Sequence, residues 1–184
     1  MSEAGIPNMA STAPPSARSF FERLLGVLRL DSSSYDDVAA DPRALGQAAA
    51  IVVIAALGRS ISAQGGPLSF QAIWFLCQLI LLWPALSLLV YAIGRWFGHT
   101  PDVLRVARVM GFSMAPFALG ILHLIPVDWA RNAVDLLWVA LLIATLVVGI
   151  RQSLQTTTGQ AAFISVVIAM ILFFVSMVYQ YLTT

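Results

Sequence analysis

Residues 68–93 read LSFQAIWFLCQLILLWPALSLLVYAI, a run without a single Asp, Glu, Lys or Arg. An α-helix rises about 1.5 Å per residue, so roughly 20 apolar residues cross the ~30 Å hydrocarbon core of a bilayer. A stretch this long and this free of charge therefore predicts a membrane-spanning helix. It decides the fold class, because much of the remaining sequence repeats the same pattern.

The composition of the whole chain agrees with this prediction. Of the 184 residues, 59% are apolar and 10% are charged, and the mean hydropathy is +0.86. Soluble domains carry about 25% charged residues. All ten basic residues are Arg, and nine acids bring the net charge to +1, which offers no polybasic surface for nucleic acid. The single cysteine, Cys77, lies within an apolar run, so no disulfide is expected.

Five windows are long and apolar enough to be read as spanning helices. We predict them at about residues 43–62, 68–93, 101–125, 130–150 and 161–182, joined by short connections. The first window is the weakest, because its uninterrupted apolar part is brief. Together they predict an all-α membrane protein: a five-helix transmembrane bundle with a short N-terminal interfacial amphipathic helix.

The segment before these windows divides into two parts. Residues 1–18 are rich in Pro, Ser, Thr and Ala and predict a disordered leader that lacks the apolar stretch of a secretory signal. Residues 19–30 begin with Ser19 and Glu22, the spacing of a capping box. We predict a helix lying in the membrane interface, with packing on the bundle as the alternative. Its apolar face is formed by Phe20, Phe21, Leu24 and Leu28.

The stretch between this helix and the first window is interpreted as a connection. Residues 31–35 predict a polar break. Asp41 followed by Pro42 then predicts the start of the next helix, because Asp is a favoured N-cap and Pro is favoured at the first helical position.

The distribution of arginines predicts the orientation. Cytoplasmic loops carry an excess of basic residues. With five crossings, the side of the N-terminus holds eight arginines and the other side two, namely Arg18, Arg23, Arg29, Arg43, Arg95, Arg105, Arg108 and Arg151 against Arg59 and Arg131. We therefore expect the N-terminus in the cytoplasm and the C-terminus outside. The Ala-rich and Lys-free composition indicates a bacterial protein, and so the bacterial inner membrane.

Two prolines lie inside predicted spans. Pro84 and Pro116 each remove a backbone N–H and free the carbonyl four residues earlier. We interpret both as packing kinks. The alternative is that they break the helices to build a transport site.

Charged residues near the ends of the windows form a second group of candidates. Arg131 and Asp135 lie four residues apart and are interpreted as an ion pair at the interface, with a functional pair inside the membrane as the alternative. Arg105 and Arg108 are expected to extend to lipid phosphates, or to line a polar inner mouth of the bundle.

No catalytic or cofactor site is predicted. Gly111, Phe112 and Ser113 match the G-x-S turn of intramembrane serine proteases, whose nucleophile needs a histidine within hydrogen-bond reach. His123 lies ten residues further along the same helix, about 15 Å away, and His99 precedes the helix. Two histidines without repeated spacing offer no metal site. We therefore expect no enzyme, no cofactor and no metal.

Four stretches of the chain resemble the Yip1 domain family, in its bacterial branch. They are FFERLLGVL at 20–28, DPRALGQAAAIVVIAAL at 41–57, YAIGRWFGHTPDVLRVARVMGFSMAPFALGILHLIP at 91–126 and QSLQTTTGQAA at 152–162. The third is the most specific. Its loop glycine, polar helix start, Arg-Val pair, Gly-aromatic step and helix proline fall on Gly94, Asp102, Arg105, Val106, Gly111, Phe112 and Pro116. The resemblance covers about residues 20–182.

The resemblance implies a membrane bundle with a cytoplasmic N-terminus. Eukaryotic members are trafficking proteins associated with Rab GTPases at Golgi and ER membranes, and this role is not expected in a bacterium, where no Rab exists. We expect a non-catalytic interaction or scaffold protein. Its partners are the lipid bilayer and either a second copy or another protein, but no nucleic acid and no metal. The alternative is a small transporter or channel that uses the kinks at Pro84 and Pro116.

Overall fold

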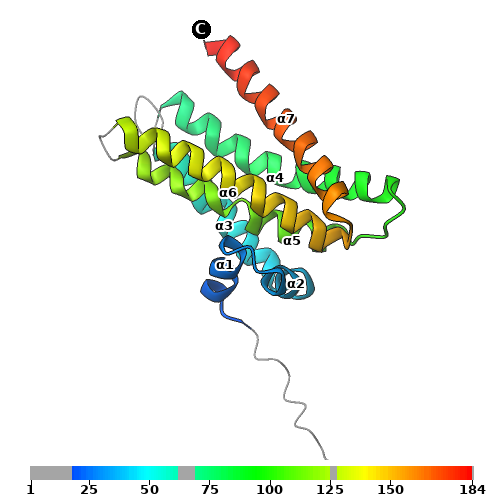
Figure 1. Ribbon diagram of the computed structural model, residues 1–184. Coiled ribbons are helices and arrows are strands. Elements are labelled where there is room, and N and C mark those ends of the chain that lie inside the picture. Colours follow the sequence, from blue (N-terminus) through cyan, green and yellow to red (C-terminus); the bar gives the residue numbers. More distant parts are fainter. Residues whose placement is uncertain (1–17, 62–68, 125–127, 184) are drawn as a thin grey trace, which may run out of the picture.

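The computed structural model describes residues 18–61, 69–124 and 128–183, and within these ranges every element is helical. Most of the expected leader lies outside the described residues. Figure 1 shows a bundle of long helices with two short helices, α1 and α2, packed below it in this view, beside α3 and α5. The elements are α1 (Phe20–Leu28), α2 (Ser32–Ala40), α3 (Ala44–Ile61), α4 (Phe70–Trp96), α5 (Val103–Ser113), the 3₁₀ helix η1 (Ala115–Leu124), α6 (Asp128–Leu154) and α7 (Thr158–Thr183).

Three helices are long and apolar enough to cross a bilayer, over Ala72–Trp96, Ala133–Leu154 and Thr158–Val175. α2 and α3 meet the same criteria only as a pair that is bent by 116°. The described residues therefore hold three to four candidate spans, whereas the sequence predicts five. The part of the first predicted window that the structure describes is too short to count as a span by itself. The third predicted window is divided between α5 and η1.

The third window changes helix type in its middle. α5 ends at Ser113, a turn follows at Met114, and η1 continues as ten residues of 3₁₀ helix. Pro116 explains the change, because it has no N–H to donate and its ring crowds the carbonyl four residues earlier. Long 3₁₀ runs are uncommon. Pro116 therefore marks a break in the third predicted window, and not only the packing kink that the sequence predicts.

α2 occupies the stretch where the sequence predicts a polar break. Asp31 is its N-cap, and the carboxylate accepts a hydrogen bond from the N–H of Ser33 over 3.1 Å. Tyr35, Val38 and Ala39 follow at helical spacing and are buried against α5 and α6. Serine and aspartate favour turns and caps. Because this segment is rich in both, its sequence is more typical of a turn than of a helix with a buried apolar face.

Small residues allow α3 to approach its neighbours closely. Ala44 and Ala48 are fully buried, whereas Gly46 and Ala50 on the same helix are exposed. A Cβ added at Gly111 of α5 would lie 2.6 Å from the Cβ of Ala48. Close packing through small residues is the usual way in which helices associate within lipid, so α3 and α5 meet almost backbone to backbone.

α7 packs against the bundle along its first half. Ala161, Ile164 and Ile168 are buried, whereas Phe173 and Phe174 are each 68% exposed. In Figure 1 the second half of α7, in red, projects away from the other helices. This divergence leaves a large apolar surface on α7 that suits contact with hydrocarbon.

Candidate functional site

α1 and α2 form a small module that a buried arginine attaches to the bundle. The side chain of Arg23 is 2% exposed. Its Nε donates to Oδ2 of Asp37 over 2.8 Å, and its Nη2 lies 2.7 Å from Oδ2 of Asp41. Its Nη1 donates to Oε1 of Gln47 over 3.1 Å. One α1 side chain therefore binds α2, the turn after it and α3.

Hydrogen bonds lower the pKa of two carboxylates of this module, Asp31 and Asp41. Those from Ser33 and Ser34 lower the pKa of Asp31 to about 2. The backbone N–H of Arg43, followed by the Arg23 side chain, lowers the pKa of Asp41. Burial alone would lower the pKa of Arg23, but its carboxylate partners outweigh burial and raise it. The ion pair between Arg23 and Asp41 is therefore formed at neutral and mildly acidic pH.

The apolar residues of α1 divide between two faces. Phe20, Leu24 and Leu28 are partly buried against the core of the protein. Phe21 and Leu25 lie one turn apart and point outward, with 71% and 51% of their surface exposed. We call this exposed pair the α1 face. The helix thus packs on the bundle with one side and presents an apolar contact surface with another.

Two arginines of α5 bind the ends of other helices. Nη2 of Arg108 donates to the carbonyl of Ala39 in the last turn of α2 over 2.7 Å, and the residue is 7% exposed. Nη2 of Arg105 donates to the carbonyl of Gln152 in the last turn of α6 over 3.1 Å. Last-turn carbonyls lack partners within their helix and carry the negative end of its dipole. Arg108 therefore contacts protein, where the sequence predicts contact with lipid phosphates or a polar mouth.

Hydroxyl groups join α5 to α6 at the break before η1. Oγ of Ser113 donates to the carbonyl of Val109 over 3.0 Å and lies 3.2 Å from that of Thr145, while Oγ1 of Thr145 donates to the carbonyl of Ser113 over 3.0 Å. A Cβ added at Gly149 would lie 2.5 Å from Ser113 Oγ. Ser113 and Thr145 are buried, and buried backbone groups need hydrogen-bond partners within the protein. Ser113 therefore closes a helix break, and Thr145 is a partner that the sequence analysis missed.

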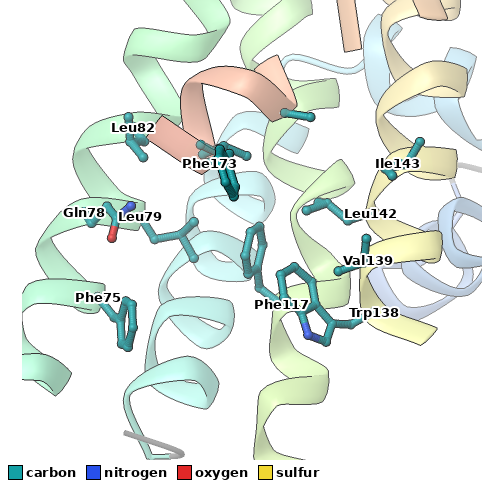
Figure 2. Close-up of a pocket in the computed structure, with 12 residues that line it drawn as sticks. Phe75, Gln78, Leu79, Leu82, Phe117, Trp138, Val139, Leu142, Ile143 and Phe173 are labelled. Atoms are coloured by element: carbon teal, nitrogen blue, oxygen red, sulfur yellow. The ribbon is translucent and has the colours of Figure 1, made fainter. Parts of the chain in front are cut away.

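A cavity of about 320 Å³ lies beside this break, between α4, η1, α6 and α7. Figure 2 shows Phe117 of η1 and Trp138 of α6 side by side in it, with Gln78 on α4 at the left. The two ring centroids are 5.2 Å apart. Apart from Gln78 the lining is aliphatic or aromatic, namely Phe75, Leu79, Leu82, Phe117, Trp138, Val139, Leu142, Ile143, Ala169, Leu172 and Phe173. Such a lining suits hydrocarbon better than a hydrated ion.

The remaining predicted positions lie on α4 and α6. Asp135 is exposed, and its Oδ1 accepts a hydrogen bond from Nε1 of Trp138 over 3.0 Å. The side chain of Arg131 lies outside the described part of the chain, so its ion pair with Asp135 stays a prediction. Pro84 is exposed within α4, which continues through it as one helix. Among the described residues, no group of three or more His, Cys, Asp or Glu is placed to hold a metal ion.

These features define an α-helical membrane protein with apolar helices of spanning length and a small helical module that packs on the bundle. A family model described as the Yip1 domain matches residues 25–179. Because this match covers most of the chain, the protein belongs to the Yip1 domain family, and the resemblance to this family seen in the sequence is confirmed. The matched range begins within α1, so α2 and the second half of α1 are part of the domain. No match was found among curated proteins or solved structures.

Proposed function

We propose that the protein is a non-catalytic membrane protein that acts as an interaction or scaffold module. The observation that carries this proposal is the α1 face, because Phe21 and Leu25 are exposed on a helix that Arg23 holds in place from its opposite side. An apolar pair at this spacing suits the headgroup boundary of a bilayer or the apolar groove of a partner protein. The expected partners are the bilayer and either a second copy or another protein.

We also propose that α3 and the segment α5–η1 cross the bilayer, which gives five crossings. α3 packs along α4, α5 and η1, and the hydroxyl bonds at the break satisfy carbonyls that a crossing would bury. Five crossings place eight of the ten arginines on the side of the N-terminus, which is then the cytoplasmic side of a bacterial inner membrane. Compartment reporters fused to the two termini should report opposite compartments. The same compartment at both ends would refute five crossings.

The α1 face is tested by adding charge to it. We expect Phe21→Glu and Leu25→Glu to reduce the recovery of co-purifying proteins from native membranes, because each places a carboxylate in an apolar contact. Ala40→Glu is the matched control, since it adds the same charge at an exposed position of α2. All three variants should insert at normal levels. Unchanged recovery with both α1 variants would remove the contact role from this face.

One observation favours a small transporter as the second candidate. The broken span α5–η1 lies beside the 320 Å³ cavity, and discontinuous helices build the substrate sites of many transporters. Asp135→Asn distinguishes the two functions. Loss of solute flux in vesicles at normal protein level would support the transporter, whereas the scaffold predicts no effect of this change on flux.

A further inference from the structure

A second cavity, of about 360 Å³, lies where α4 and α6 end and α5 begins. We call it the rim cavity. Its lining includes His99, Asp102, Arg105, Ser153 and Gln155. In contrast to the cavity beside η1, most of these side chains are polar. Its chemistry is therefore that of a site for a polar group.

Two residues that line the rim cavity each have a buried side-chain nitrogen without a hydrogen-bond partner in the described residues, Nε of Arg105 and Nε2 of His99. The guanidinium of Arg105 is held in place through Nη2, which donates to Gln152. A buried donor without an acceptor destabilises a protein, so native structures rarely leave one. An oxygen acceptor that enters the cavity would satisfy the guanidinium, and also the imidazole in the tautomer protonated at Nε2.

The charge around the rim cavity favours an anion. Asp102 is its one acid, and its two carboxylate oxygens already accept the backbone N–H groups of Leu104 and Arg105 over 3.1 and 3.2 Å. The N-terminus of α5, together with Arg108, whose Nη2 lies 3.8 Å from Oδ2 of Asp102, thus compensates the charge of Asp102. The flanking segments 91–108 and 148–160 carry four arginines, namely Arg95, Arg105, Arg108 and Arg151, against this single acid.

Exposed aromatic residues surround the same end of the bundle. Trp96 is 82% exposed, Phe97 is 39% exposed and Phe163 of α7 is 55% exposed. The rings of Phe97 and Phe163 meet edge to face, with centroids 6.4 Å apart. Aromatic side chains concentrate at the headgroup level of a bilayer. The rim cavity, whose lining begins one residue after Phe97, therefore lies near the depth of lipid phosphates.

We propose that the rim cavity binds a phosphate ester, with Arg105 and His99 as the donors. A guanidinium offers fixed, parallel N–H groups that match phosphate oxygens. The ester is either the headgroup of a phospholipid or a soluble phosphate ester, and the aromatic surroundings favour the phospholipid. This binding does not depend on the α1 face, so either proposal can fail without the other.

The test uses the full-length protein in detergent and three probes. They are dioleoyl phosphatidylglycerol, glycerol 3-phosphate, which has the phosphate without the chains, and dioleoylglycerol, which has the chains without the phosphate. Binding raises the unfolding temperature by mass action, and native mass spectrometry counts the bound molecules. We expect phosphatidylglycerol to bind and dioleoylglycerol to have no effect. Glycerol 3-phosphate binding as tightly as the lipid would assign the site to soluble esters.

Variants locate the binding to the rim cavity. Arg105→Gln and His99→Gln should each weaken phosphatidylglycerol binding by roughly tenfold, the effect of losing one good hydrogen bond. Arg151→Gln is the control, because it removes an exposed arginine at the same end that does not line the cavity. His99→Gln leaves the bond from Arg105 to α6 intact, so it remains informative if Arg105→Gln fails to fold. Equal weakening by Arg151→Gln and His99→Gln, or equal binding of dioleoylglycerol, would overturn the proposal.

Discussion

Arg23→Met tests how the α1–α2 module is attached to the bundle. The change keeps most of the length and apolar volume of the side chain, but removes the donors to Asp37, Asp41 and Gln47. Removing one partner of a fully buried ion pair costs about 3–5 kcal/mol. The side chains of Asp37 and Asp41 are 30% and 23% exposed, so water recovers part of this cost. We therefore expect a loss of about 2–3 kcal/mol.

This loss should be local to the module. A cost of 2–3 kcal/mol raises the population of the detached state roughly 30- to 150-fold. Hydrogen exchange measured by mass spectrometry on the full-length protein should show faster exchange in α1 and α2, with little change in α4 and α6. Such local opening is what amide exchange detects when a unit is less stable than the whole.

Arg29→Met provides the control, because Arg29 is exposed at the end of the same helix. Exchange in α1 and α2 should then stay within about threefold of the unmodified protein, as expected for surface substitutions. If Arg23→Met and Arg29→Met gave the same exchange rates in α1, the argument that a buried arginine attaches the module would be refuted.

Three further predictions concern packing and pH. Thr145→Val should lower the free energy of unfolding by about 1–2 kcal/mol in detergent titrations, because the carbonyl of Ser113 loses its donor; an unchanged value would contradict this bond. Gly111→Ala should cost about 1–3 kcal/mol in the same assay, since its Cβ would lie 2.6 Å from that of Ala48. The pKa of Asp31 is lowered to about 2, so its contribution to the stability of the α1–α2 module is complete above about pH 4 and is lost as the pH falls through 2. Amide exchange in α1 and α2, corrected for the pH dependence of the intrinsic exchange rate, should therefore rise only between these pH values.

The long helices are predictable because their signal is local. The windows 68–93, 130–150 and 161–182 correspond to α4, α6 and α7 within a few residues at most ends. Each is a long apolar run, which predicts a membrane-spanning helix by its length and composition alone. This prediction requires no knowledge of the helices that pack against it. The Yip1 domain match confirms the family that the four sequence stretches indicate.

The break before η1 and the attachment of α1 are not predictable in the same way. Pro116 signals a disturbance in the third window, but the bond that satisfies the carbonyl of Ser113 comes from Thr145, which lies 32 residues away. Arg23 follows an amphipathic pattern that places it on the polar side of α1. It is buried because α2 and the turn after it supply two carboxylates to its guanidinium, and α3 supplies an amide oxygen. The sequence does not predict α2. Both features depend on tertiary neighbours that no single segment specifies.

The 3₁₀ geometry of η1 makes this segment longer than an α-helix with the same number of residues. A 3₁₀ helix rises about 2.0 Å per residue and an α-helix about 1.5 Å, so the ten residues of η1 extend about 20 Å where an α-helix would extend about 15 Å. Rewinding η1 as an α-helix would shorten it by about 5 Å, a difference comparable to that between thin and thick cellular bilayers. In the proposed arrangement with five crossings, this change of helix type would alter the length of the segment by about the difference between such bilayers.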